Sequence, residues 1–303
     1  MMSLPTRVTV YEVGPRDGLQ NEAGLIPVEV KAEFIRQLLA AGHTAVETTS
    51  FVSPTWVPQL ADAAELLELI EAPPGVRMPV LVPNDKGLDR ALAAGVKEIA
   101  VFGSATETFA QKNLNRSVAE SLEMFRPVVD RARAAGLLVR GYLSMCFGDP
   151  WEGAVAPETV AGHARTLFDM GITELSLGDT IGVGTPGQVV ALLEALGQQG
   201  ISVDRLAVHF HDTYGQALAN TLIAMQHGIT VIDASAGGLG GCPYAKSATG
   251  NLATEDLLWQ LNGLGIETGV DLMALARTSI WMAEQLGRPS PSRAVQALSK
   301  ELS

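Results

Sequence analysis

The chain of 303 residues is 47% hydrophobic and 18% charged, which predicts a compact soluble protein with a large core. The formal net charge of −12 excludes nucleic acid and anionic membrane from the expected partners. Only two cysteines, a stretch before the first strand too short for a targeting peptide, and no apolar run of bilayer length predict a cytoplasmic protein in a reducing compartment.

One unit recurs along the chain: a strand, a polar loop, a helix and a glycine. Alternating apolar residues predict eight strands, at residues 7–13, 44–49, 78–82, 98–102, 138–144, 173–177, 205–211 and 230–236. Helices are predicted between them, near residues 58–70, 85–95, 117–135, 157–171 and 186–200, with two more that end at Gly42 and Gly228. Helices often end on a left-handed residue, which suits Gly42, Gly95, Gly136, Gly171, Gly200 and Gly228.

Eight strand–helix units predict an α/β protein with a (β/α)8 TIM barrel. An open doubly wound sheet is the alternative, but no glycine-rich phosphate turn follows the first strand. We expect one domain over residues 1–303, with the barrel at about 7–265 and an additional C-terminal helical segment at 266–303. Within that segment, residues 271–286 form an amphipathic helix and the tail from residue 289 is expected to be mobile.

The loops after the strands carry the chemistry of such a barrel, and two histidines stand at the end of the seventh strand. His209 and His211 are two residues apart, so their side chains project from the same face. If that face is the lumen, the two imidazoles form half of a metal site. The alternative is two polar residues hydrogen-bonded to neighbouring strands.

Charged residues follow or lie within three other strands. Arg16 and Asp17 come after the first strand, where they form either a surface ion pair or a fixed cation beside a metal-binding carboxylate. Glu47 lies inside the second strand, and a buried carboxylate needs a partner. Asp179 ends the sixth strand, where it either caps the following segment or supports the site.

A glycine-rich loop follows the eighth strand, with four glycines among residues 237–241 and Cys242 at its tip. The thiol is either an inert small hydrophobe or a group brought over the barrel mouth by a closing loop. Asn251 starts the next helix as an N-cap or as an oxygen ligand. One carboxylate, two imidazoles and one amide oxygen suit Mg²⁺ or Mn²⁺, with Zn²⁺ the alternative. This set fits carbon–carbon bond cleavage or formation next to a carbonyl.

Five motifs carry a specific resemblance, at residues 13–22, 47–54, 177–186, 209–220 and 237–245. They read VGPRDGLQNE, ETTSFVSP, LGDTIGVGTP, HFHDTYGQALAN and GGLGGCPYA, and they resemble 3-hydroxy-3-methylglutaryl-CoA lyase along nearly the whole chain. The resemblance implies divalent-metal-dependent cleavage of that thioester to acetyl-CoA and acetoacetate. It also implies an acyl-CoA substrate. We further expect a homodimer.

The resemblance assigns roles residue by residue. It implies that the metal ligands are Asp17, His209, His211 and Asn251. It implies that the catalytic residues are Arg16, Asp17, Glu47, Asp179, His209 and Cys242, with Cys242 as the acid. Substrate contacts fall to Arg16, Gln20 and Lys112, of which Lys112 is a basic residue at the mouth that either meets the CoA phosphates or is an ordinary solvated charge.

Some features depart from the family or leave alternatives. Animal members carry a mitochondrial targeting segment and a cysteine near the C-terminus, and neither is found in this chain. A Claisen-type synthase of the isopropylmalate or homocitrate kind is one alternative. Those enzymes have Arg-Asp-Gly-Glu-Gln where this chain has Leu19 before Gln20, and they lack the Gly-Gly-Cys loop. A lyase for a related 3-hydroxyacyl-CoA and a non-catalytic metal-binding barrel are the others.

Overall fold

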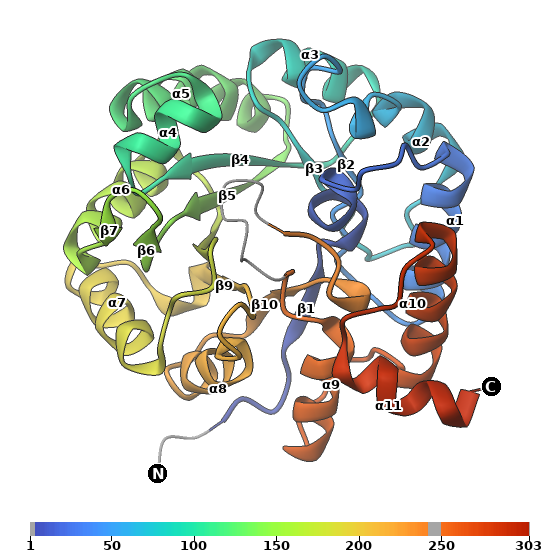
Figure 1. Ribbon diagram of the computed structural model, residues 1–303. Helices are drawn as coiled ribbons and strands as arrows, with labels where there is room; N and C mark the ends of the chain where they lie inside the picture. The colour runs from blue at the N-terminus through green and yellow to red at the C-terminus, as the bar shows by residue number, and fades with distance from the viewer. Residues whose placement is uncertain (1–3, 242–249, 303) are drawn as a thin grey trace.

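The structure is a computed structural model that describes residues 4–241 and 250–302. Eight parallel strands form a ring surrounded by helices, in the order β1-β10-β9-β8-β5-β4-β3-β2 (Figure 1). The strands are β1 Thr9–Glu12, β2 Thr49–Ser50, β3 Val80–Leu81, β4 Glu98–Ser104, β5 Leu138–Ser144, β8 Glu174–Asp179, β9 Leu206–Phe210 and β10 Val231–Ala234. Each lies within or overlaps one of the eight predicted strands, and β2 overlaps its predicted range only at Thr49.

Backbone pairing closes the ring between the first and second strands. Glu12 forms a parallel bridge with Val46, and its N–H donates to the Ala45 carbonyl at 3.0 Å. The Glu47 N–H donates in turn to the Glu12 carbonyl at 2.8 Å. Residues 45–47 therefore belong to the barrel wall ahead of β2, as the predicted second strand requires. The predicted TIM barrel is confirmed.

Helices cover the outside of the barrel. They are α1 Val28–Ala40, α2 Ala63–Leu69, α3 Asp85–Ala93, α5 Val118–Ala134, α6 Pro157–Met170, α7 Pro186–Gln198, α8 Ala217–Gln226 and α9 Thr254–Gly263. The six helix-ending glycines all have positive φ. At Gly42, with φ of 105°, a Cβ atom would also lie 2.2 Å from the Gly269 carbonyl oxygen, so this position requires glycine.

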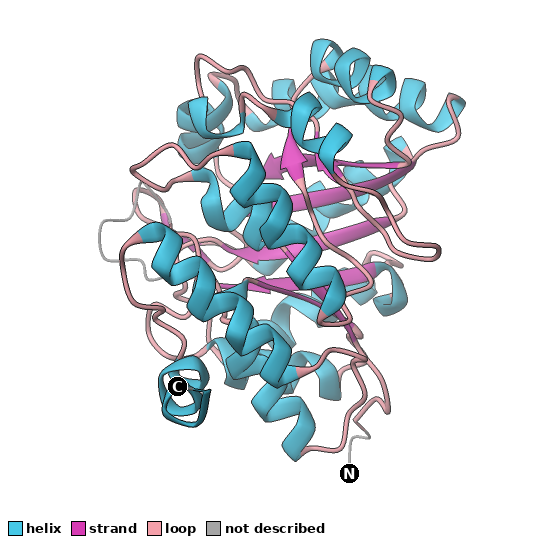
Figure 2. Cartoon of the chain, turned by 90° about the vertical axis from the view of Figure 1, so that its right-hand side faces the viewer, coloured by secondary structure: helices cyan, strands magenta, loops and turns pink. Residues whose placement is uncertain are grey.

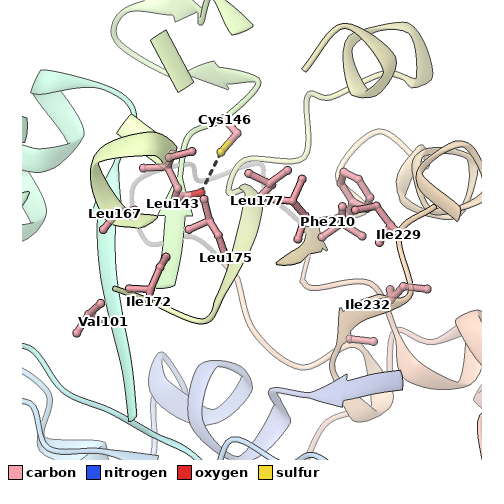
Figure 3. Close-up of a cluster of buried hydrophobic side chains, with 14 of the residues drawn as sticks. Val101, Leu143, Cys146, Leu167, Ile172, Leu175, Leu177, Phe210, Ile229 and Ile232 are labelled. Atoms are coloured by element: carbon pink, nitrogen blue, oxygen red, sulfur yellow. Dashed lines mark hydrogen bonds between the residues drawn. The ribbon is translucent and has the colours of Figure 1, made fainter. Parts of the chain in front are cut away.

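The main core lies between the strands and these helices. Figure 3 shows part of it, where Val101, Leu143 and Leu175 of the barrel wall lie near Leu167 of α6. Cys146 belongs to the same cluster, and its thiol donates to the Leu143 carbonyl at 3.0 Å. Strands covered in this way are apolar on their outward face, so the polar residues of the barrel point into the lumen.

The C-terminal segment is more ordered than predicted. Helix α10, Leu272–Leu286, matches the expected amphipathic helix, but the expectation of a mobile tail is wrong, because α11, Arg293–Leu302, is helical (Figure 2). The Asp256 carboxylate of α9 accepts from Ser292 Oγ at 2.8 Å and from the Ala294 N–H at 2.7 Å. These bonds satisfy donors at the start of α11, which explains why the tail forms a helix.

Two insertions decorate the mouth of the barrel. Between β4 and α5 the chain contains an additional helix, α4 Glu107–Leu114, which carries Lys112. After β5, strands β6 Gly148–Asp149 and β7 Gly153–Ala154 form a small antiparallel hairpin. Short 3₁₀ turns occur at Pro58–Leu60, Val203–Arg205 and Ala236–Gly238. None of the helices within residues 4–241 and 250–302 is long and apolar enough to cross a membrane.

Candidate active site

A tight turn after β1 presents the first two charged groups of the site. Residues Gly14–Gly18 form one turn of π-helix, in which the N–H groups of Asp17 and Gly18 both donate to the Val13 carbonyl, at 2.8 and 3.1 Å. Such turns are rare and often occur at functional sites. The turn places Arg16 and Asp17 side by side at the carboxyl end of the barrel.

Three potential metal ligands converge there. Asp17, His209 and His211 each offer one ligand atom, and these atoms all lie within 4.8 Å of one another. The two imidazoles are adjacent, with ring centroids 5.4 Å apart, as expected for residues two apart at the end of β9 and just after it. Residues far apart in the sequence therefore form one cluster, which the pairing of β1 with β10 and of β10 with β9 brings together.

Asn251 completes the cluster with an amide oxygen. Its Nδ2 donates to Asp17 Oδ2 at 2.8 Å and to the Leu239 carbonyl at 3.0 Å. Because both of these partners are acceptors, the orientation of the amide is fixed. The buried Asn251 Oδ1 accepts no hydrogen bond from the residues that the structure describes. An orphaned oxygen beside a carboxylate and two imidazoles fits a divalent ion such as Mg²⁺ or Mn²⁺.

The charge state of Asp17 suits this role. Burial raises the pKa of its carboxyl, but the Arg16 cation at 2.7 Å and the neighbouring His209 outweigh burial and lower that pKa to about 2. Asp17 is therefore ionised at neutral pH. An ionised carboxylate is the form that binds a hard cation.

Arg16 is a fixed cation beside the cluster. Its Nη1 contacts Asp17 Oδ1 at 2.7 Å and its Nη2 contacts Glu47 Oε2 at 2.8 Å. The Tyr142 hydroxyl donates to the same Glu47 oxygen at 2.8 Å. Burial disfavours the guanidinium charge, but Glu47 and Asp17 outweigh it and hold the pKa of Arg16 above its usual range. Arg16 is thus the partner that the buried Glu47 was expected to need.

The remaining candidate residues from the sequence are Asp179, Gln20, Lys112 and Cys242. Asp179 accepts from the Val183 and Gly184 N–H groups, at 3.0 and 2.9 Å, so it caps the turn after β8; burial raises its pKa to about 6. Gln20 is partly buried one turn after Arg16. Lys112 is exposed, with its amine 4.9 Å from the centre of the Trp151 ring. Cys242 lies outside the described residues.

Three lumen residues near the site were missed from the sequence. Arg140 is fully buried and contacts Asp233 through Nη2 at 2.6 Å and Glu174 through Nε at 2.7 Å. Tyr142 follows it two residues later on β5, and Asp233 stands on β10 opposite His209. The alternation of residues along each strand could have identified them, because polar residues at alternate positions of a barrel strand face the lumen.

Two buried carboxyl groups accept hydrogen bonds from the loops of the site. Glu12 accepts from the Gly14 and Ala236 N–H groups, at 2.8 and 2.9 Å, and from Thr254 Oγ at 2.7 Å. It thus ties the π-helical turn to the glycine-rich loop. Glu255 accepts from the Gly237 N–H at 2.9 Å and from the Ser279 hydroxyl. Burial raises the pKa of Glu12 to about 7 and that of Glu255 to about 8.

These carboxyl groups predict that stability falls as pH rises from about 4.5 to about 8. In the unfolded chain Glu255 ionises near its ordinary pKa of 4.5, whereas in the folded chain it keeps its proton up to about pH 8. The folded state therefore binds more protons between these values, and its stabilisation is lost as pH rises through the window, by about 1.4 kcal/mol per pH unit for one group. Denaturant unfolding at pH 6.5 and 8.5 measures the change.

Glu255→Gln should flatten this dependence, since glutamine does not titrate. The exposed Glu284 provides the control, and Glu284→Gln should keep the wild-type slope. An equal slope in wild type and Glu255→Gln would show that this carboxyl is already ionised at pH 6.5.

Comparison with known proteins agrees with this geometry. The HMGL-like family profile matches residues 7–281. A mitochondrial hydroxymethylglutaryl-CoA lyase of Bos taurus is 54% identical over 298 residues, covering 98% of this chain and 91% of that protein. A crystal structure of hydroxymethylglutaryl-CoA lyase from Pseudomonas aeruginosa has a TM-score of 0.96 at 51% identity and covers 99% of this chain and 100% of that one.

A more distant structure extends the comparison. An HMG-CoA lyase from Acinetobacter baumannii, in complex with coenzyme A and 3-methylmalate, has a TM-score of 0.92 at 35% identity and covers 99% of this chain and 96% of that one. The family profile spans most of the chain, and the relatives match almost its full length. The protein therefore belongs to the HMGL-like family, which includes the hydroxymethylglutaryl-CoA lyases.

Proposed function

We propose that the protein is a divalent-metal-dependent carbon–carbon lyase that cleaves 3-hydroxy-3-methylglutaryl-CoA to acetyl-CoA and acetoacetate. The observation that carries the proposal is the convergence of Asp17, His209 and His211 within 4.8 Å, with Arg16 held beside Asp17. Relatives with this activity in their names are more than half identical to the chain over nearly its whole length.

The HMGL-like family is divalent-metal dependent, and Mg²⁺ or Mn²⁺ is the ion we propose here. Asp17, His209, His211 and the Asn251 amide oxygen would hold it. When bound, such an ion supplies Lewis acidity and a template for the oxygen atoms of the substrate.

In the cleavage, the C3 hydroxyl gives its proton to water and the C2–C3 bond breaks. The bonding electrons move into the thioester, so that acetoacetate leaves and the enolate of acetyl-CoA remains. Arg16 stabilises the negative charge that develops on the enolate oxygen. Glu47 and Tyr142 keep the guanidinium in place for this task. Cys242 delivers the proton to the enolate carbon.

Other residues bind or support. We assign Gln20 and Lys112 to the CoA thioester, since Gln20 lies one turn after Arg16 and Lys112 is a cation on α4, after β4. Asp179 supports the site by holding the turn after β8, through its bonds to Val183 and Gly184.

We also propose one domain over residues 1–303, with the barrel at about 7–265 and a C-terminal segment at 266–303, and assembly as a homodimer. A cytoplasmic location is proposed from the buried free thiol of Cys146, although relatives include both mitochondrial and cytoplasmic forms by name. Sedimentation equilibrium tests the dimer, and limited proteolysis tests the single domain.

The direct test of function is an assay of the purified protein with Mg²⁺ and 3-hydroxy-3-methylglutaryl-CoA. Equal amounts of acetoacetate and acetyl-CoA are expected. Incubation with acetyl-CoA and 2-oxo acids distinguishes a Claisen-type synthase. Release of free CoA by that second reaction, with no acetoacetate from the first, would overturn the proposal.

Replacing Arg16 by lysine should lower kcat by about a hundredfold, with little change in KM, by analogy with the loss of one oxyanion donor. Lysine keeps the positive charge, but it cannot contact both Asp17 and Glu47 with the fork geometry of a guanidinium. Steady-state kinetics measures both constants.

Arg77→Lys is the matched control, because Arg77 also pairs with a buried carboxylate, Glu98, but lies at the opposite end of the strands. It should retain the wild-type kcat. If Arg16→Lys changed only KM, Arg16 would be a substrate anchor and not a stabiliser of the developing charge.

A further inference from the structure

Asp233 lies behind one of the proposed metal ligands. It stands on β10, which is the neighbour of β9 in the ring (Figure 1). It pairs with His209 of β9 and is 1% exposed. Its Oδ2 is 3.3 Å from His209 Nδ1. Of the two ring nitrogens of His209, Nδ1 therefore faces the carboxylate and Nε2 is left for another partner.

The other contacts of Asp233 show that its carboxylate accepts a hydrogen bond from His209 Nδ1. Arg140 donates to Oδ1 through Nη2 at 2.6 Å and to Oδ2 through Nη1 at 3.2 Å, and Ser176 Oγ donates to Oδ2 at 2.8 Å. Both oxygens of Asp233 therefore pair with the Arg140 cation, the contact expected of an ionised carboxylate. An ionised carboxylate only accepts hydrogen bonds, so the bond to His209 requires a proton on Nδ1.

Arg140 in turn holds this carboxylate still. Its guanidinium carbon lies 3.8 Å from the ring centre of Tyr11 and 4.7 Å from that of Tyr142, and its Nε donates to Glu174 at 2.7 Å. The side chain is fully buried in the lumen. The Arg140 cation is thus stacked against two rings and paired with two carboxylates. It therefore fixes the position of the Asp233 carboxylate relative to β9.

We propose that Asp233 is a positioning residue that keeps neutral His209 in its Nδ1-protonated tautomer, so that the Nε2 lone pair faces the divalent cation. A neutral imidazole has one donor and one acceptor nitrogen, and a proton on Nε2 would block binding. Arg140 anchors Asp233 for this task. The inference rests on the metal site of the proposed function and names the residue that sets the donor atom of one ligand.

The tautomer is measured directly in the wild-type chain. Long-range ¹H–¹⁵N correlation spectra of the metal-free, ¹⁵N-histidine-labelled protein are recorded at alkaline pH, and His209→Gln identifies the His209 signals among those of five histidines. A protonated Nδ1 is expected. A protonated Nε2 on His209 would overturn the inference without the need for any variant to fold.

Asp233→Asn should reverse the tautomer. The single amide oxygen still accepts from Arg140, and the amide N–H₂ then faces Nδ1, which favours a proton on Nε2. The Kd for Mn²⁺, measured by electron paramagnetic resonance, should rise by roughly 10- to 100-fold, as for other partners of metal-ligating histidines.

Glu174→Gln is the matched control, since it removes the other carboxylate of Arg140 without touching His209. It should leave both the tautomer and the Kd for Mn²⁺ as in wild type. An Asp233→Asn protein with Nδ1 still protonated and an unchanged Kd would overturn the inference. Acetoacetate formation does not enter these readouts, so a chain with the expected tautomer and no lyase activity would refute the proposed function alone.

Discussion

Exhaustive chelation with EDTA should abolish acetoacetate formation, and Mg²⁺ or Mn²⁺ should restore it. The reason is the donor set, in which the orphaned Asn251 oxygen and the ionised Asp17 carboxylate lie with two imidazoles at the end of the barrel. The chain offers no other cation than Arg16 in contact with Asp17 among its described residues, and one arginine cannot also organise the oxygens of the substrate. Acetoacetate assays before and after chelation measure the effect.

His211→Ala separates loss of the ion from nonspecific effects of chelation. It removes one imidazole, so titration calorimetry should show weaker binding of Mn²⁺ and the kcat should fall at subsaturating metal. His163 on α6 is the control, because it lies outside the cluster, and His163→Ala should bind Mn²⁺ like wild type. Full turnover after chelation would remove the metal from the mechanism.

The second large effect is expected at Cys242. Replacing it by serine should lower kcat by roughly 10²- to 10⁴-fold, the usual contribution of general acid catalysis, because a hydroxyl is a far weaker acid than a thiol. Substrate and Mn²⁺ should still bind almost normally. Steady-state kinetics together with Mn²⁺ titration measures these quantities.

The described residues on both sides of this segment support the assignment. Asn21 donates to the Gly241 carbonyl at 3.0 Å, and a Cβ on Gly240 would lie 2.5 Å from Asn251 Nδ2. After the segment, Asn251 donates a hydrogen bond to the Asp17 carboxylate. The described residues just before Cys242, Leu239 and Gly240, therefore lie beside the proposed ligand Asn251.

Cys146 is the control for the thiol. It is buried, its S–H donates to the Leu143 carbonyl, and burial raises its pKa, so it is unreactive. Cys146→Ser should retain most activity and remain sensitive to thiol alkylation, whereas Cys242→Ser should be insensitive. Normal turnover by Cys242→Ser would require another proton donor for the enolate carbon.

Short-range patterns determined much of this protein. Apolar alternation, helical spacing and helix-ending glycines predicted the eight strands, most of the helices and the closed barrel, because each of these signals arises within a few residues. The shared face of His209 and His211 follows from strand geometry alone. Motifs at the strand ends were sufficient to indicate the family.

Only the tertiary structure decided which distant groups meet. The start of α11 is capped by Asp256, which accepts a hydrogen bond from the N–H of Ala294, 38 residues later in the chain. Nothing in the local sequence of the tail predicted this contact or the helix that it supports. The orientation of Asn251 depends on Asp17, and the tautomer proposed for His209 depends on Asp233 and Arg140. A hydrogen bond across the barrel depends on strand register and ring closure, and these are properties of the packed chain that no local pattern encodes.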